Sequence, residues 1–307
     1  MNVVVFGAGS LGSLVGGLLA REHAVTLVGR DPHVAAVRES GLRVEGAFDF
    51  GVRPEATTDG RGLDADLAVV TVKAFDTETA ADALATGDVD AVISLQNGLG
   101  NETTLAARLD CPVLAGTVTY GAELSAPGVV TCTGEGDVAL GPRSGGTSAV
   151  ADRVGRAFRA AGIETSVADD MPRRLWEKLA VNAAINATTA LARVENGALL
   201  DGPAGAVAAD AARETARVAR AEGVDLDDET AVGALRDVAE ATAANASSMH
   251  QDVRAGDRTE VEAIYGYVTA RARERDVSIP VVRTLRTLVR AWEAEHVDTD
   301  SNRDRPS

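Results

Sequence analysis

Short apolar runs alternate with stretches of helical composition over the first half of the chain. A β-branched run at residues 2–6 (NVVVF) precedes a stretch rich in Ala, Leu and Gly, and a second run (AVTLV) follows at 24–28. Runs of this length and composition are typical of strands buried on both faces. Further strands are predicted at residues 66–72, 91–95 and 113–118. Strands that alternate with helices in this way predict a parallel, doubly wound sheet of the α/β class.

The pattern changes at Gly116, where short β-prone pieces such as GVVTCTG and DVALGPRSGG are separated by Gly and Pro. We expect antiparallel strands there, because Gly and Pro mark tight turns. A helix near residues 149–161 and a strand near 163–167 are expected to complete the α/β part.

A second change follows Asp169. The β-rich runs end and Ala, Arg and Glu recur with the 3.6-residue period of a helix, which predicts an all-α region. We therefore expect an α/β domain at residues 1–168, an all-α domain at 169–297 and a flexible polar tail at 298–307. The length of 307 residues agrees with two domains, since one domain commonly has about 100–200 residues.

The composition, with 45% apolar and 25% charged residues, is that of a folded globular protein. No apolar run approaches the roughly 20 residues of a membrane-spanning helix, and the first residues lack the basic region of a signal peptide. We therefore expect a cytoplasmic protein with no membrane partner.

The formal net charge of -16 bears on the expected partners. Acidic surfaces repel phosphate backbones, so nucleic acid is not an expected partner. Diffuse Asp and Glu, abundant Ala and few aromatic residues resemble the proteins of salt-loving organisms, and Lys73 and Lys178 are the only lysines. At about 1 M salt the Debye length falls to about 3 Å, so an acidic protein can still bind an anionic substrate through close contacts.

Neither the cysteines nor the histidines indicate a metal site. Cys111 and Cys132 are not spaced as a redox or metal motif, and we expect them to be reduced thiols. The four histidines are scattered along the chain, without the spacing of metal ligands.

The turn after the first predicted strand has the sequence GAGSLG at residues 7–12. A strand, a G-x-G-x-x-G turn and a helix in succession form the dinucleotide-binding fingerprint. In that fingerprint Gly7 permits the tight turn, Gly9 lets a pyrophosphate approach the backbone, and Gly12 allows close packing of the helix on the strand. The alternative is a purely structural turn. The residues expected to contact a dinucleotide here are Gly7, Ala8, Gly9, Ser10, Leu11 and Gly12.

The end of the second predicted strand bears on which dinucleotide is bound. An acidic residue there usually accepts the ribose 2′-hydroxyl of NAD, whereas this chain has Arg30 followed by Asp31. A guanidinium suits a 2′-phosphate, which favours NADPH (NADP+). The alternative, with Arg30 at the surface and Asp31 on the ribose, permits NADH.

The second half contains a polar stripe within an apolar helix. Lys178, Asn182 and Asn186 lie at i, i+4 and i+8 in WEKLAVNAAINATTAL, which places them on one helical face. Asn is a mediocre helix former, so helix stability alone does not account for the stripe. A solvated face is the alternative. Such a face would be expected to carry Glu, Asp or Arg, and none occurs between Lys178 and Asn186.

A polar segment, NASSMHQDVRAGDRTEVEAIYG, follows at residues 245–266. Taken alone, its polar side chains, among them Ser248 and Glu260, are explained by helix capping and solvation.

Taken together, these motifs resemble those of the ketopantoate reductase (2-dehydropantoate 2-reductase) family over nearly the whole chain. The resemblance rests on GAGSLG at the start, TVKA around Lys73, QNGLG around Asn97 and YGAELSAPGVVTCTGEG from Tyr120. It continues in the two segments of the second half quoted above. It implies a Rossmann-like dinucleotide-binding domain followed by an α-helical substrate-binding and catalytic domain, with the active site in the cleft between them.

The resemblance also implies roles for individual residues. Lys178 is implied as the general acid, and Glu260 as a second catalytic residue beside it and the substrate. The residues implied to line the substrate pocket are Asn97, Asn182, Asn186 and Ser248. Those implied to lie on the cofactor side, besides the glycine turn and Arg30, are Lys73, Asn97 and Glu260.

The implied reaction is the NADPH-dependent reduction of ketopantoate to (R)-pantoate, a step of pantothenate and coenzyme A biosynthesis. Hydride attacks the C2 ketone, and a protonated lysine stabilises the charge that develops on oxygen and supplies the proton. A related NAD(P)H-dependent reductase of another 2-ketoacid, and a dinucleotide-sensing regulator without chemistry, are the alternatives. We expect a monomer or a homodimer.

Overall fold

The computed structural model describes residues 1–297, and the tail predicted at 298–307 lies outside the described residues. Contacts divide the chain into two compact units. Within the described residues, the first consists of Met1–Gln96 and Asn101–Met171, and the second of Asn97–Gly100 and the chain from Pro172 to residue 297. The chain therefore passes from the first unit to the second after Met171, and the short stretch 97–100 is an exception to this order.

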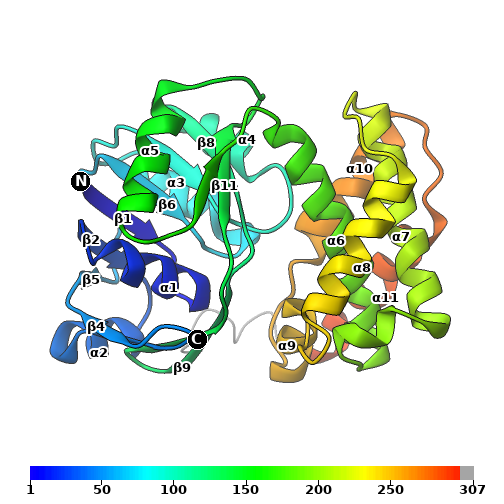
Figure 1. The fold of residues 1–307 in the computed structure, drawn as a ribbon, viewed down its shortest axis with the longest axis horizontal. Coiled ribbons are helices and arrows are strands. Elements are labelled where there is room, and N and C mark those ends of the chain that lie inside the picture. The colour runs from blue at the N-terminus through cyan, green and yellow to red at the C-terminus, as the bar shows by residue number, and fades with distance from the viewer. Residues whose placement is uncertain (298–307) are drawn as a thin grey trace. The chain divides into compact units, whose positions relative to one another are not determined.

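An eight-stranded sheet forms the centre of the first unit (Figure 1). Its strands, in spatial order, are β12 (Thr165–Val167), β11 (Val138–Pro142), β8 (Val113–Val118), β7 (Val92–Ser94), β6 (Leu67–Val70), β1 (Asn2–Phe6), β2 (Ala24–Val28) and β5 (Glu55–Thr57). The strands from β8 to β5 pair in parallel, whereas β11 pairs antiparallel with β8. The predicted doubly wound sheet is confirmed. Chain order runs outward from β1 in both directions, so the carboxyl end of β1 is a topological switch point, where ligands of such sheets bind.

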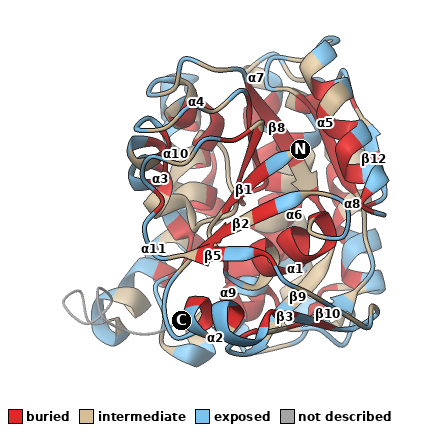
Figure 2. Cartoon of the chain, turned by 90° about the vertical axis from the view of Figure 1, so that its left-hand side faces the viewer, coloured by how far each residue is buried: buried red, intermediate tan, exposed pale blue. Residues whose placement is uncertain are grey.

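The central strands are continuous apolar runs because both of their faces are covered. β6 and β7 are buried at every position, and β1 and β2 are each buried at three of their five positions (Figure 2). The helices of the first unit are α1 (Ser10–Leu19), α2 (His33–Ser40), α3 (Thr77–Leu84), α4 (Asn101–Ala106) and α5 (Ala149–Ala160), with the 3-10 turn η1 (Ala74–Asp76). α1 packs directly on the sheet, since a Cβ on Gly16 would lie 2.4 Å from Leu27 Cδ2 of β2.

A second sheet of the first unit has the order β4 (Phe50–Val52), β3 (Leu42–Gly46), β10 (Val129–Gly134) and β9 (Gly121–Ala126). β10 pairs antiparallel with β9 and parallel with β3. The antiparallel strands expected after Gly116 are confirmed, but their separation into a second sheet was not predicted, nor were β3, β4 and β5. These three strands have three to five residues and include exposed positions, so their apolar signal in the sequence is weak.

Every regular element among the described residues of the second unit is a helix, which confirms the all-α prediction. Its elements are α6 (Met171–Ala192), the 3-10 turn η2 (Asn196–Leu199), α7 (Gly202–Ala221), α8 (Asp228–Ala241), α9 (Ser248–Ala255), the π-helical segment η3 (Glu262–Gly266), α10 (Tyr267–Glu274) and α11 (Pro280–His296). The core contains many alanines from α6 and α7, and small side chains let helices approach closely.

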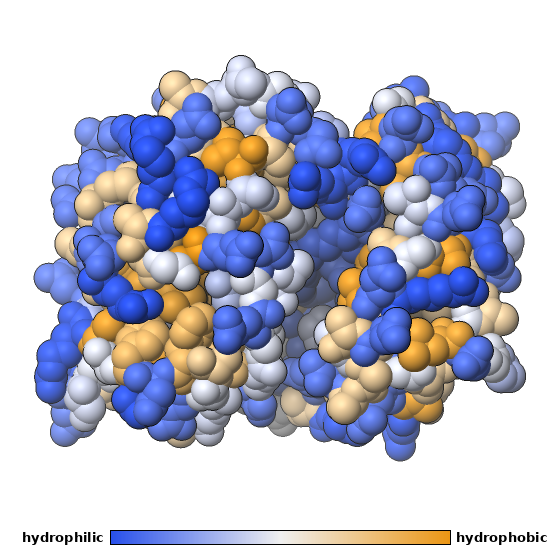
Figure 3. All heavy atoms as spheres, viewed as in Figure 1, coloured by the Kyte–Doolittle hydropathy of each residue, from blue (hydrophilic) through white to orange (hydrophobic). Residues whose placement is uncertain are grey.

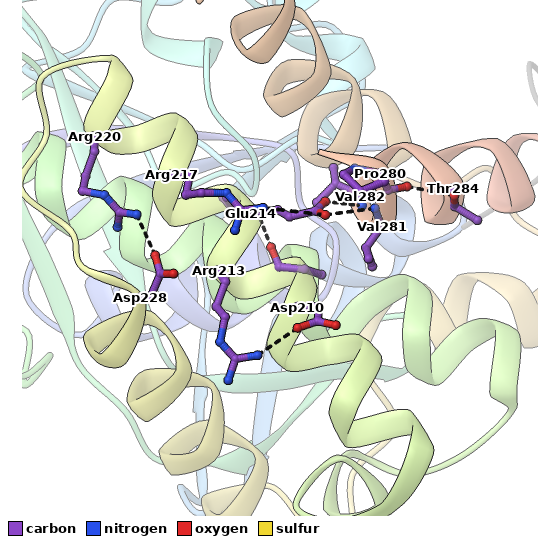
Figure 4. A network of polar contacts seen from close by, with 12 residues as sticks. Asp210, Arg213, Glu214, Arg217, Arg220, Asp228, Pro280, Val281, Val282 and Thr284 are labelled. Carbon is purple, nitrogen blue, oxygen red and sulfur yellow. Dashed lines mark hydrogen bonds and ion pairs between the residues drawn. The ribbon is translucent and has the colours of Figure 1, made fainter. Parts of the chain in front are cut away.

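A buried carboxylate fixes the start of α11 (Figure 4). Glu214 of α7 is 3% exposed and accepts the N–H groups of Val281 and Val282 at 3.1 and 2.9 Å. The first N–H groups of a helix lack partners within the helix, and the positive end of its dipole stabilises a carboxylate. Glu214 therefore ties α11 to α7.

Over residues 1–297, no helix combines the length and the apolar composition needed to cross a bilayer. Figure 3 shows hydrophilic residues spread over the visible surface of each unit, as the acidic composition requires.

Candidate functional site

The turn between β1 and α1 has the geometry of a dinucleotide-binding loop. Gly7 has φ +114, a conformation that favours glycine. Its N–H and that of Ala8 donate to the Val28 carbonyl at the end of β2, at 2.9 and 2.8 Å. The hydroxyl of Thr71, which follows β6, donates to the Gly7 carbonyl at 2.9 Å. The turn is thus held at the switch point of the sheet.

The remaining two glycines of the turn are present for different reasons. A Cβ on Gly12 would lie 2.0 Å from the Gly7 carbonyl oxygen and 2.5 Å from Thr71 Oγ1, so packing within the protein requires glycine there. A Cβ on Gly9 would have no neighbour within 4 Å, and its φ of -83 suits any residue. Neither backbone conformation nor internal packing requires glycine at position 9, and the open space beside it would let a ligand approach the backbone.

The start of α1 offers hydrogen-bond donors to such a ligand. Gly9 is the N-cap, and no side chain caps the helix. The first N–H groups of a helix have no partner within it, and they lie at the positive end of its dipole. The Ser10 hydroxyl accepts the Leu124 N–H of β9 at 3.0 Å and is therefore engaged elsewhere. The backbone of the turn thus fits a pyrophosphate.

Arg30 follows β2, and its guanidinium lies 3.2 Å from the carboxylate of Asp76, the last residue of η1. The Arg30 side chain is 58% exposed, so a phosphate can reach it. Asp31 faces its own helix instead, because its Oδ1 accepts the N–H of Ala35 in α2 at 3.1 Å. Lys73, which is half-buried, directly precedes η1. The predicted cofactor residues of the first unit therefore follow the ends of β1, β2 and β6.

A buried histidine supports this part of the first unit. His33 Nδ1 accepts the Gly128 N–H at 3.0 Å, so the proton resides on Nε2, which donates to Ser13 Oγ of α1 at 3.0 Å. Burial lowers the pKa of the His33 imidazole and so favours its neutral form. One neutral side chain therefore joins α1, α2 and the turn between β9 and β10.

In the second unit, Lys178, Asn182 and Asn186 lie on α6, as their spacing predicts. Asn186 is 4% exposed, and Lys178 and Asn182 are half-buried. The stripe is not a solvated face, and that alternative is wrong. No hydrogen bond joins the side-chain amides of Asn182 or Asn186 to another described residue. Both amides can therefore bind a ligand without breaking a bond within residues 1–297.

Glu260 is buried and held from several sides. Its carboxylate accepts from Asn97 Nδ2 at 3.3 Å, and its backbone carbonyl accepts the Ile264 N–H at 3.1 Å. The preceding residue, Thr259, donates its N–H and its hydroxyl to Glu293 of α11, at 2.8 and 2.7 Å. Two of the predicted site residues, Asn97 and Glu260, are thus brought together although they lie far apart in the sequence.

The loop 97–100 belongs to the helical unit, although it lies in the first half of the chain. Gly98 has φ +80, and a Cβ there would lie 2.6 Å from the Ala263 carbonyl oxygen, so the loop backbone packs directly on η3. The Leu99 N–H donates to the same carbonyl at 3.4 Å. The membership of this loop in the second unit was not predicted. Its sequence signal is the glycine that the close approach requires.

Ser248 is exposed in the first turn of α9, whereas its neighbour Ser247 is buried. Ser247 Oγ accepts the His250 N–H at 3.1 Å and lies 2.7 Å from Thr189 Oγ1 of α6. The segment that carries Ser248 is therefore tied to the helix of the polar stripe through Ser247. This link was not predicted, because the sequence does not show which of the two adjacent serines is buried against α6.

Tyr265 of η3 is a further unpredicted contact of α6. Its side chain is fully buried, and its hydroxyl donates to the Ala183 carbonyl and accepts the Ala187 N–H, both at 2.8 Å. These alanines follow Asn182 and Asn186 directly. The sequence gives no indication that a tyrosine in an apolar run bonds to the backbone of a distant helix, so this contact was not predicted.

Two family profiles match the chain. The profile described as "Ketopantoate reductase PanE/ApbA" matches residues 3–145, and the profile described as "Ketopantoate reductase PanE/ApbA C terminal" matches residues 170–293. Every residue predicted above for the cofactor or substrate site falls within these two ranges.

Curated relatives match over nearly their whole length. The 2-dehydropantoate 2-reductase of Halobacterium salinarum is 49% identical over 299 residues, which cover 94% of this chain and 98% of that protein. That of Archaeoglobus fulgidus is 42% identical over 295 residues, covering 95% and 98%. A solved structure of a PanE/ApbA family ketopantoate reductase from Ralstonia eutropha has a TM-score of 0.89 at 35% identity, covering 97% and 100%. The similarity therefore extends over both units.

Proposed function

The chain belongs to the ketopantoate reductase family, and we propose that it reduces the C2 ketone of 2-dehydropantoate to (R)-pantoate with NADPH. The observation that carries the proposal is the sheltered stripe of α6, on which the Lys178 amine is followed at helical spacing by two amides, those of Asn182 and Asn186. Neither amide is hydrogen-bonded to another residue within 1–297. Such a set can bind an anionic ketoacid and protonate it.

The first unit would hold the cofactor, which supplies the hydride. The glycine turn fits its pyrophosphate, since the space beside Gly9 is open and the start of α1 offers N–H donors. Arg30 suits a 2′-phosphate. Asp31, the alternative partner of a 2′-hydroxyl, already accepts the Ala35 N–H of α2 with one carboxylate oxygen. These contacts favour NADPH over NADH.

Lys178 would be the proton donor. A free lysine amine has a pKa of about 10.4 and is therefore protonated at neutral pH. As hydride reaches the ketone carbon, negative charge develops on its oxygen, and an adjacent ammonium stabilises that charge and transfers a proton. General-acid catalysis of this kind contributes about 10²- to 10⁴-fold.

The amides would orient the substrate. Asn182 and Asn186 can donate to the carboxylate and accept from the hydroxyl without adding charge. Asn97 and Glu260, already joined by a hydrogen bond, would accept the substrate hydroxyl and hold the amine of Lys178 in place. Ser248 adds an exposed hydroxyl at the start of α9.

The test is the initial rate of purified protein with 2-dehydropantoate and either NADPH or NADH in molar KCl. Lys178→Ala is expected to lower kcat by about 10²- to 10⁴-fold and to leave the Kd of NADPH unchanged. Arg173→Ala, which removes an exposed cation from the same helix, is the control and is expected to keep wild-type rates. Arg30→Ala is expected to abolish the preference for NADPH.

Other outcomes would contradict the proposal in different ways. Turnover of another 2-ketoacid but not of 2-dehydropantoate would make the protein a related reductase. Binding of NADPH without turnover of any 2-ketoacid would make it a sensor of dinucleotides. Undiminished turnover in Lys178→Ala would show that another group donates the proton.

A further inference from the structure

The hydroxyl of Tyr265 is bonded to both members of one backbone pair of α6. An undistorted helix joins the N–H of residue 187 to the carbonyl of residue 183. Here the phenol donates to the Ala183 carbonyl and accepts the Ala187 N–H, with both distances at 2.8 Å. A side chain bonded to both groups of this ladder constrains the local path of the helix.

The need to satisfy backbone groups does not explain these bonds. The two backbone groups can pair with each other, and a phenylalanine of nearly the same volume would fill the same space. The hydroxyl therefore adds a geometric constraint on α6. Burial raises the pKa of the Tyr265 hydroxyl, so it keeps its proton and remains a donor to Ala183.

The constraint acts at the polar stripe. Ala183 and Ala187 directly follow Asn182 and Asn186, the two amides of the proposed substrate site. Tyr265 itself belongs to η3. Another residue of η3, Ile264, donates its N–H to the backbone carbonyl of Glu260. π-helical segments inside helices are frequent at functional sites. One hydroxyl thus connects the segment that carries Glu260 with the part of α6 that carries the amides.

We propose that Tyr265 is a positioning residue, whose hydroxyl sets the path of α6 between residues 183 and 187 and thereby orients Asn182 and Asn186 relative to Glu260. The inference rests on the proposed function, because it assigns these side chains to the substrate. A displacement of about 1 Å in a positioning group can cost about 10²-fold in rate. Loss of the hydroxyl is therefore expected to lower kcat/KM for the substrate. The cofactor residues lie in the first unit, so the Kd of NADPH is expected to stay unchanged.

The experiment compares Tyr265→Phe with a matched control, Thr215→Val. Thr215 is also fully buried in the helical unit, and its hydroxyl donates to the Ala211 carbonyl of α7, away from the stripe. Tyr265→Phe is expected to lower kcat/KM for 2-dehydropantoate about 10- to 100-fold, with the Kd of NADPH unchanged. It is also expected to speed amide hydrogen exchange in α6 around residues 182–187. Thr215→Val is expected to leave both readouts at wild-type values.

A second variant, Ala187→Ser, keeps the phenol but adds a hydroxyl that can bond to the carbonyl four residues earlier, that of Ala183. It competes for the acceptor of Tyr265, and we expect a fall in kcat/KM in the same direction even if Tyr265→Phe does not fold. Ala216→Ser, at an equally buried alanine of α7, is its control.

The outcomes separate this proposal from the proposed function. If the wild type is active and Tyr265→Phe or Ala187→Ser keeps kcat and KM within about twofold, the hydroxyl has no positioning role. If the wild type does not reduce 2-dehydropantoate, the proposed function fails. Hydrogen exchange alone then decides whether the Tyr265 hydroxyl sets the path of α6. Unchanged exchange at residues 182–187 then overturns the role of Tyr265, and faster exchange that is absent from Thr215→Val supports it.

Discussion

Two alanine substitutions in one turn should have opposite effects on folding and on cofactor binding. Gly9→Ala adds a methyl group where no protein atom lies within 4 Å. Gly12→Ala adds the same group 2.0 Å from a backbone oxygen. If the turn holds a dinucleotide, the first substitution obstructs the ligand and the second obstructs the protein.

The stability of Gly9→Ala should stay close to that of the wild type. The backbone at Gly9 is extended, so alanine gains about 0.4–1 kcal/mol from a less flexible unfolded chain. Alanine is a poorer N-cap than glycine, at a cost of similar size. The two effects offset each other, whereas a methyl group against the pyrophosphate should weaken NADPH binding at least about tenfold, which corresponds to 1.4 kcal/mol.

Gly12→Ala should lose stability. In a helix interior alanine is favoured by about 1 kcal/mol over glycine. Against that gain, the new Cβ meets the Gly7 carbonyl and Thr71 Oγ1, and overpacking of this kind costs about 1–3 kcal/mol, with rigid backbone at the upper end. For a protein of this size, each kcal/mol lost lowers Tm by about 2–4 °C.

Thermal unfolding followed by circular dichroism in molar KCl gives Tm, and calorimetric titration with NADPH gives Kd. The expected pattern is an unchanged Tm with weakened binding in Gly9→Ala, and a lowered Tm in Gly12→Ala. Wild-type NADPH affinity in a correctly folded Gly9→Ala would refute the reasoning, because the open space beside Gly9 would then have no ligand to explain it.

Two further predictions concern charged and titratable groups of the first unit. Asp76→Asn removes the carboxylate that pairs with Arg30. NADPH should then bind up to about fivefold more tightly, while the Kd of NADH stays constant. Equal changes in the Kd of both cofactors, measured by calorimetry, would contradict this. The pKa of His33 is lowered in the folded state, so as pH decreases the unfolded state binds the proton first. The free energy of unfolding should therefore fall as pH decreases below about 6.5. The contribution of this group is at most about 1.4 kcal/mol per pH unit. Urea unfolding of His33→Gln at pH 7.5 and 5.5 should show a weaker pH dependence than the wild type, and an equal dependence would assign the effect to other groups.

The parts of the fold that were predictable are those with strong local patterns. β1, β2 and β8 have the predicted limits, because their continuous apolar runs end in glycine or polar residues. β3 and β4 were missed, because strands of three to five residues with exposed positions carry little periodic signal. β4 pairs with β3, and the pairing of β3 with β10 depends on contacts between distant parts of the chain, which local propensity does not encode.

The candidate site likewise has parts that the sequence predicts and parts that it does not. The glycine turn and the stripe of α6 were recognisable, since their spacing alone places the groups. The hydrogen bond between Asn97 and Glu260, and the bonds of Tyr265 to α6, join positions that no spacing relates. In these cases the sequence supplies the chemical groups, and only the fold supplies their partners.

The distribution of these groups makes cofactor binding and substrate turnover separable by mutation. Gly9 and Arg30 belong to the unit built on the parallel sheet, whereas Lys178 and Tyr265 belong to the helical unit. Substitutions of the first pair should therefore change the Kd of NADPH, and substitutions of the second pair should change kcat at constant Kd. Asn97 is the informative exception, because its loop lies in the first half of the sequence but packs on η3. Asn97→Ala should accordingly behave like a variant of the helical unit and lower kcat/KM with little effect on NADPH affinity. A loss of NADPH affinity alone would place Asn97 with the cofactor.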